Sequence, residues 1–164
     1  MPSYDKVKYL IIHTSDSPFG NVDIIRTWHL ARGFSNIGYH YVILNGYAKA
    51  IKDPYIPSSD GSIELGRKES ENGAHTIGYN SNSIGICLIG KHGKYTPKQM
   101  TTLLALSVHL MNKYNILTGH VLGHYETDNG KSQGKTCPDI SMSDLRLELD
   151  KSQKLISSFN NLNL

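Results

Sequence analysis

The sequence predicts an α/β fold, a single domain with a central mixed β-sheet of about five strands flanked by helices. Short apolar runs alternate along the chain with segments of helical periodicity. Several of these runs are almost continuously apolar, which is typical of strands covered on both faces. The 164 residues suit one domain, and neither an internal repeat nor a linker divides residues 1–164.

The first strand and the first helix have clear boundaries. Residues 7–15, VKYLIIHTS, are apolar and β-branched, so they predict a buried strand with His13 at its carboxyl end. Residues 21–33 then show apolar side chains at helical spacing. Asn21 can cap the start of this helix and Gly33 can end it.

The middle of the chain predicts a hairpin, a long loop and a second buried strand. Two strand-like runs in residues 39–52 surround Asn45 and Gly46, a pair that favours a tight β-hairpin. Residues 53–83 are rich in Pro, Ser, Gly and Asn, and we expect a long functional loop. Residues 84–90, IGICLIG, predict the second buried strand.

The next segment predicts a helix followed by a short strand. Thr96 and Gln99 form a capping-box pattern, and Pro97 suits the first helical position. Residues 120–124, HVLGH, predict a strand that ends at His124. Because ligand sites in such folds lie outside the carboxyl ends of strands, both strand-end histidines are candidates for a site.

The C-terminal part predicts a polar loop and a final helix. The loop covers residues 125–140, and the amphipathic helix begins near Ser141 or Ser143. We expect it to decay into a frayed tail at about residues 158–164.

Composition narrows the classes of partner. The net charge of +3 and the pI of about 8.8 suit a polyanion such as a cell-wall polymer. No basic arm is present, which argues against nucleic acid. No apolar run approaches the ~18 residues that a membrane span needs, and the N-terminus lacks the features of a signal peptide. We expect synthesis in the cytoplasm.

The chain offers residues for a catalytic zinc site, which takes three protein ligands and leaves one position for water. His13 and His124 end strands, and Cys137 lies in the polar loop after the second of them. The alternative for such histidines is a hydrogen bond to the backbone. Cys137 follows Lys135 by two residues, and a cation or a metal would lower the pKa of its thiol. A free thiol, or a disulfide to Cys87, is the alternative for Cys137; Cys87 itself lies in an apolar strand.

Six stretches in order resemble a known family, the zinc-dependent N-acetylmuramoyl-L-alanine amidases of type 2. This family includes the phage lysozymes that are chemically amidases and the peptidoglycan recognition proteins. The stretches cover about three-quarters of the chain. They are IIHTSDS (11–17), IRTWHLARGFSNIGYHYVI (25–43), GAHTIGYNSNSIGICLIG (73–90), YTPKQMTTLLALSVHLM (95–111), GHYE (123–126) and KTCP (135–138).

The resemblance implies a role for each matching residue. His13, His124 and Cys137 match the ligands of one zinc ion per chain. Tyr39 matches the catalytic tyrosine, and Lys135 matches the catalytic lysine of the phage enzymes. Both could donate to the oxyanion that develops during amide hydrolysis, while the metal supplies hydroxide.

Other residues are expected around this site. We place His40, His75 and Asn80 in a substrate groove, and Glu126 beside a ligand histidine. A tyrosine in a strand is more often a packing residue, and Tyr39 should face away from His40. His120, four residues before His124, is the rival ligand, and only the resemblance decides between them.

The implied function is cleavage of the bond between N-acetylmuramic acid and L-alanine in peptidoglycan. We expect a bacteriolytic phage or prophage endolysin, acting as a monomer on peptidoglycan or muropeptides in the periplasm after release by a holin or secretion machinery. The alternatives are a non-catalytic peptidoglycan-binding protein, against which Cys137 argues, and a regulator of RNA polymerase.

Overall fold

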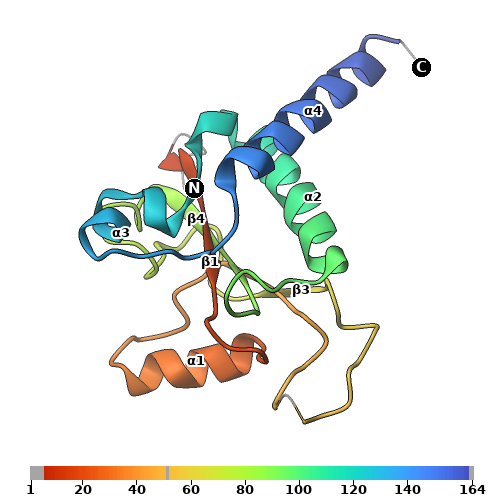
Figure 1. The fold of residues 1–164 in the computed structure, drawn as a ribbon. Helices are drawn as coiled ribbons and strands as arrows, with labels where there is room; N and C mark the ends of the chain where they lie inside the picture. Colours follow the sequence, from red (N-terminus) through yellow and green to blue (C-terminus); the bar gives the residue numbers. More distant parts are fainter. Residues whose placement is uncertain (1–5, 51, 163–164) are drawn as a thin grey trace.

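The computed structural model describes residues 6–50 and 52–162, and it contains one five-stranded mixed sheet in the order β3-β2-β4-β1-β5 (Figure 1). The strands are β1 (Tyr9–Thr14), β2 (Tyr41–Ile43), β3 (Ile63–Leu65), β4 (Ser83–Leu88) and β5 (Val121–Gly123). β1 pairs in parallel with β4 and β5, and β2 pairs in parallel with β4. Only β3, at one edge, runs antiparallel to its neighbour. The predicted α/β class with a mixed sheet is confirmed.

Helices lie on both faces of the sheet (Figure 1). They are α1 (Val22–Ala31), α2 (Pro97–Tyr114), α3 (Asp128–Ser132) and α4 (Met142–Asn160), with 3-10 turns η2 (Thr118–His120) and η3 (His124–Glu126). α2 and α4 pack against each other on one face, and α1 lies on the opposite side. No helix in the described parts of the chain has the length and apolar character needed to cross a membrane.

Side chains along β1 point alternately to the two faces of the sheet, and each face carries its own apolar cluster. Leu10 and Ile12 lie in the cluster that contains α2 and α4. His13, the next residue, therefore points to the other face. Its register partner on β4 is Cys87, which packs in the second cluster with Ile25 of α1. The pleat thus places His13 on the face that carries α1.

The predicted helix starts are confirmed. The side chain of Asn21 accepts a hydrogen bond from the first turn of α1 at 2.9 Å. Thr96 and Gln99 make the reciprocal capping box of α2. The buried amide of Gln99 also donates to the carbonyl oxygens of Ile43 (3.0 Å) and Ile89 (2.8 Å). It therefore satisfies two carbonyls next to the ends of β2 and β4 and fixes α2 against the sheet.

The predicted hairpin around Asn45 and Gly46 is wrong. A turn forms there, since Gly46 has a φ of 89° and Asn45 accepts from the backbone of Tyr47. However, β2 pairs with residues 63–65, not with the residues that follow the turn. The amide nitrogen of Asn45 donates to the carbonyl of Pro18, and the chain makes a long excursion before it returns.

Three other boundaries differ from the predictions. The predicted loop at 53–83 includes β3, and the loop at 125–140 includes the short helix α3. Ser141, the first of the two expected caps, accepts from the backbone of Asp144 and starts α4. α4 continues to Asn160, so residues 158–160 of the expected tail are helical.

Candidate metal site and the cavity around it

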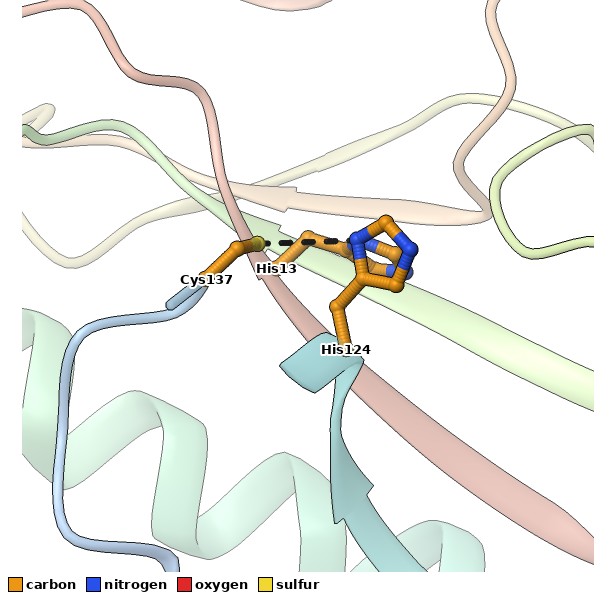
Figure 2. Close-up of side chains that lie close together, drawn as sticks. All are labelled: His13, His124 and Cys137. Carbon is orange, nitrogen blue, oxygen red and sulfur yellow. Dashed lines mark hydrogen bonds between the residues drawn. The ribbon is translucent and has the colours of Figure 1, made fainter. Parts of the chain in front are cut away.

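Three side chains from separate segments converge at the carboxyl edge of the sheet (Figure 2). His13 lies near the end of β1, and His124 immediately follows β5. Because β1 and β5 are neighbouring parallel strands, both histidines reach the same edge. Cys137 comes from the loop between α3 and α4. One ligand atom from each residue lies within 4.8 Å of those of the other two.

Backbone contacts hold the cysteine loop against the sheet. The backbone N–H of Thr14 donates to Cys137 Sγ at 3.2 Å. The backbone N–H of Tyr125 donates to the carbonyl of Cys137 at 3.0 Å, and the hydroxyl of Tyr95 donates to the carbonyl of Pro138 at 2.6 Å. The position of the thiol is therefore fixed by three elements at once.

The donor set fits a soft or borderline divalent metal such as zinc. His124 Nε2 is buried and has no hydrogen-bond partner among the described residues. Cys137 Sγ lies 3.9 Å from His13 Nδ1, which is too long for a strong hydrogen bond. Two imidazoles and one thiol that face one another without bonding well are a donor set that zinc prefers.

The surroundings keep both histidines neutral, which is the form that binds a metal. The pKa of His13 is held well below its usual value by burial, and by His75 and His124 nearby. Burial also lowers the pKa of His124, with a further contribution from Lys135. Each ring therefore keeps a lone pair available at neutral pH.

The thiol of Cys137 behaves differently from the expectation. Burial raises its pKa to about 11, although the Thr14 amide and Lys135 act in the opposite direction. Lys135 therefore lowers the pKa of the thiol as expected, but burial outweighs its effect in the metal-free protein. A metal that binds here must displace the thiol proton, so metal binding releases a proton. Both cysteines are free thiols, which excludes the disulfide alternative.

A cavity of about 670 Å³ opens above the three side chains. Tyr39 and Lys135, the predicted catalytic residues, both line it. The ring of Tyr39 lies 5.1 Å from that of His13. Burial, and then the thiols of Cys87 and Cys137, raise the pKa of Tyr39 well above its usual value, so its hydroxyl keeps its proton. Lys135 is exposed at the rim.

The three residues predicted to bind substrate lie in different surroundings. His75 lines the cavity but also packs against His13. Asn80 accepts from the backbone N–H groups of His75 and Thr76, so it shapes the loop and does not line this cavity. His40 is 1% exposed and lies away from the cavity, so its placement does not support a substrate role.

Both ring nitrogens of His40 are occupied. Nδ1 accepts from the backbone N–H of Gly85 at 3.0 Å, and Nε2 lies 3.0 Å from the carbonyl of Glu71. This imidazole therefore joins β4 to the loop before it, in the manner of a buried structural histidine.

Glu126 lies near the site but does not bond a ligand ring. It forms a two-pronged ion pair with Arg146 of α4, with N–O distances of 2.8 and 2.9 Å. It also accepts from the backbone N–H of Gly123 at 2.9 Å. Glu126 thus holds the turn that carries His124 through Gly123 and Arg146, rather than through the imidazole of His124.

The sequence did not mark several polar residues that line the cavity, among them Arg32 and His92. Arg32 follows α1 and its guanidinium lies 5.6 Å from the centre of the Phe34 ring. His92 has a φ of 54° in a turn after β4, and nothing in the sequence pattern marks it.

The rival ligand His120 lies in η2, before β5, with its ring 4.8 Å from that of Tyr9. It is therefore not part of the triad.

Comparison with known proteins adds independent evidence. A family model described as N-acetylmuramoyl-L-alanine amidase matches residues 3–140. The chain is 36% identical over 144 residues to the endolysin of Escherichia phage T7, across 81% of each chain. The solved structure of the amidase LysC from Clostridium intestinale superposes with a TM-score of 0.71 at 29% identity, covering 90% of this chain and 89% of that one. A peptidoglycan recognition protein, PGRP-SA of Apis mellifera, shares the fold with a TM-score of 0.63 at 24% identity, over 81% and 76% of the two chains.

Proposed function

The chain belongs to the N-acetylmuramoyl-L-alanine amidase family, and we propose that it cleaves its substrate with one zinc ion held by His13, His124 and Cys137. The bond cleaved is the amide between N-acetylmuramic acid and L-alanine in peptidoglycan. The observation that carries the zinc assignment is the convergence of one ligand atom each from His13, His124 and Cys137, all within 4.8 Å of one another.

The charge of the site suits this chemistry. Two neutral imidazoles and one thiolate would leave a zinc site with a net charge of +1. Zinc bound there would supply hydroxide from water at neutral pH and polarise the substrate carbonyl. The Thr14 amide, which donates to Cys137 Sγ, would stabilise the thiolate form.

Lys135 and Tyr39 are proposed as donors to the oxygen of the scissile carbonyl. Both line the cavity, Tyr39 from the segment just before β2 and Lys135 from the loop between α3 and α4. Lys135 carries a positive charge at the rim, and Tyr39 keeps its hydroxyl proton because the pKa of the phenol is raised. A donor in such a position stabilises the developing negative charge by about 3–4 kcal/mol.

The remaining cavity residues would orient the substrate. Arg32 and His92 lie on the cavity wall and offer donors to a peptide or sugar.

The complete donor triad favours an enzyme over a protein that only binds muropeptides. We propose that the enzyme acts as an endolysin on the cell wall in the periplasm. Release by a holin or secretion machinery, and contact with RNA polymerase, stay predictions from the resemblance.

Mass spectrometry of digested peptidoglycan tests the reaction. The expected products are free stem peptides beginning with L-alanine, together with intact glycan strands. New reducing ends on the glycan would show a glycosidase and overturn the assignment. Metal analysis of the purified protein should give about one zinc per chain, and full activity in protein stripped of metal would refute the role of zinc.

A further inference from the structure

We propose that His75 is a positioning residue for the metal site, which holds the imidazole of His13 in the tautomer whose Nδ1 is free to bind the metal. This inference rests on the proposed function, because it takes His13 as a metal ligand. It gives His75 a role different from the substrate contact that the sequence suggested.

The two histidines are joined directly. His13 Nε2 and His75 Nδ1 lie 2.9 Å apart, and the rings meet edge to face at 86°. A hydrogen bond between two ring nitrogens needs one donor and one acceptor. Because Nδ1 of His13 faces Cys137 Sγ and must present a lone pair to a metal, its proton belongs on Nε2. His13 therefore donates and His75 Nδ1 accepts.

The hydrogen bonds beyond His75 agree with this direction. With Nδ1 as acceptor, neutral His75 carries its proton on Nε2, which lies 3.4 Å from Ser83 Oγ. Ser83 donates its own hydrogen to the carbonyl of Tyr79 at 2.7 Å, so its oxygen is left to accept. The chain of donors ends on a backbone carbonyl, which cannot reverse its role. Thr76 Oγ1 lies 3.1 Å from His75 Nδ1 and 3.4 Å from His13 Nε2, where its oxygen can accept from the same His13 N–H. The arrangement thus favours the tautomer with the proton on Nε2 for both rings.

The loop holds the ring of His75 in one place. Asn80 Oδ1 accepts from the backbone N–H groups of His75 at 2.8 Å and Thr76 at 2.9 Å. A Cβ at Gly73 would lie 2.4 Å from His75 Cδ2, and a Cβ at Gly85 would lie 2.7 Å from the same atom. The imidazole therefore occupies a slot that exists only because both positions are glycine.

A histidine that binds a metal through one ring nitrogen is commonly oriented by a hydrogen bond from its other ring nitrogen. Loss of the partner in that hydrogen bond weakens metal binding by about 10–100-fold. We expect His75→Phe, which keeps a planar ring without nitrogen, to raise the zinc Kd within this range, as measured by chelator competition. His75→Asn should recover most of the affinity, because its amide oxygen lies near the position of Nδ1. Replacement of zinc by Co²⁺ would report a changed ligand geometry in the visible spectrum of His75→Phe.

The matched control is His29→Phe. His29 is another buried imidazole, and its Nδ1 accepts from the backbone N–H of Gly38 at 2.9 Å rather than from a metal ligand. This variant should lose stability but keep the zinc Kd. A folded His75→Phe protein that binds zinc within twofold of the wild-type Kd would overturn the inference.

The variants His75→Asn and His75→Gln decide the matter if His75→Phe does not fold. Asparagine presents its amide near the Nδ1 position, and glutamine presents it near the Nε2 position. We expect His75→Asn to bind zinc more tightly than His75→Gln, and equal affinities would overturn the inference. Wild-type protein that binds no zinc would instead overturn the proposed function, so the two failures can be told apart.

Discussion

Cys137→Ser removes the only thiol of the metal triad and leaves the loop contacts in place. A serine hydroxyl can still accept from the Thr14 amide, which now donates to Cys137 Sγ at 3.2 Å. It does not provide the negative charge that the thiolate gives the metal. Zinc binding to four-ligand peptides is worth about 10–16 kcal/mol, which is about 2.5–4 kcal/mol per ligand. We therefore expect zinc affinity to fall by about 10²–10³-fold.

Unfolding with and without zinc measures this loss. At free zinc equal to ~1,000 times the wild-type Kd, binding to the native state stabilises the wild type by about 4 kcal/mol. For Cys137→Ser the same zinc concentration would add only about 0.4–1.4 kcal/mol. Denaturant titration at fixed zinc, repeated after dialysis against a chelator, gives the free energy of unfolding with and without zinc from one protein preparation.

Cys87→Ser is the matched control, because Cys87 is the second free thiol and is fully buried beside the same site. We expect it to destabilise the metal-free protein by about 1–3 kcal/mol, since a hydroxyl enters an apolar cluster. The additional stabilisation from zinc should stay near the wild-type value. A Cys137→Ser protein that gains as much from zinc as the wild type would refute the ligand assignment.

Two further changes test the rest of the site. Lys135→Ala should keep zinc and lower kcat by about 10²–10³-fold in a peptidoglycan release assay, because a charged donor is lost; unchanged kcat would remove the role of Lys135. Glu126→Gln should lower the free energy of unfolding by about 1–2 kcal/mol at pH 7, since the pair with Arg146 is partly exposed. Arg146 and the Gly123 amide hold the pKa of Glu126 below its usual value despite burial, so this contribution is present above the unfolded pKa of about 4.3 and is lost as the pH falls through the lower folded pKa. A difference between wild type and Glu126→Gln that persists unchanged in acid would contradict this reasoning.

Local signals predicted the three longer helices and the buried strands, but not α3. The Asn21 cap and the capping box of Thr96 and Gln99 involve residues three apart, so their contacts are visible in the sequence. The failed hairpin shows the limit of such signals. Asn45 forms the turn, but its amide nitrogen bonds to Pro18, and β2 finds its partner about twenty residues later at Ile63–Leu65. No local pattern contains that distant pairing.

The site depends on contacts that are still further apart. His13 and Cys137 are separated by 124 positions, and His13 and His75 by 62. Spacing alone offered His120 as readily as His124, so the ligand set required the family resemblance. His40 and His75 show why residue type was not enough. Their rings lie 5.8 Å apart, yet Nδ1 of His40 accepts from a backbone amide while Nδ1 of His75 meets a ring nitrogen of a candidate metal ligand.

The two cysteines also show that residue type alone does not identify a metal ligand. Cys87 is the register partner of His13, so its side chain lies on the same face of the sheet and close to the candidate metal site. Burial holds the pKa of Cys87 well above its usual value, and it packs among apolar side chains next to Tyr39. Cys137 lies on a loop held by the Thr14 amide and lines the cavity, where a metal can displace its proton. Proximity to His13 alone therefore does not make a ligand; the thiol must also lie where its charge can be compensated, and of the two only Cys137 meets that condition.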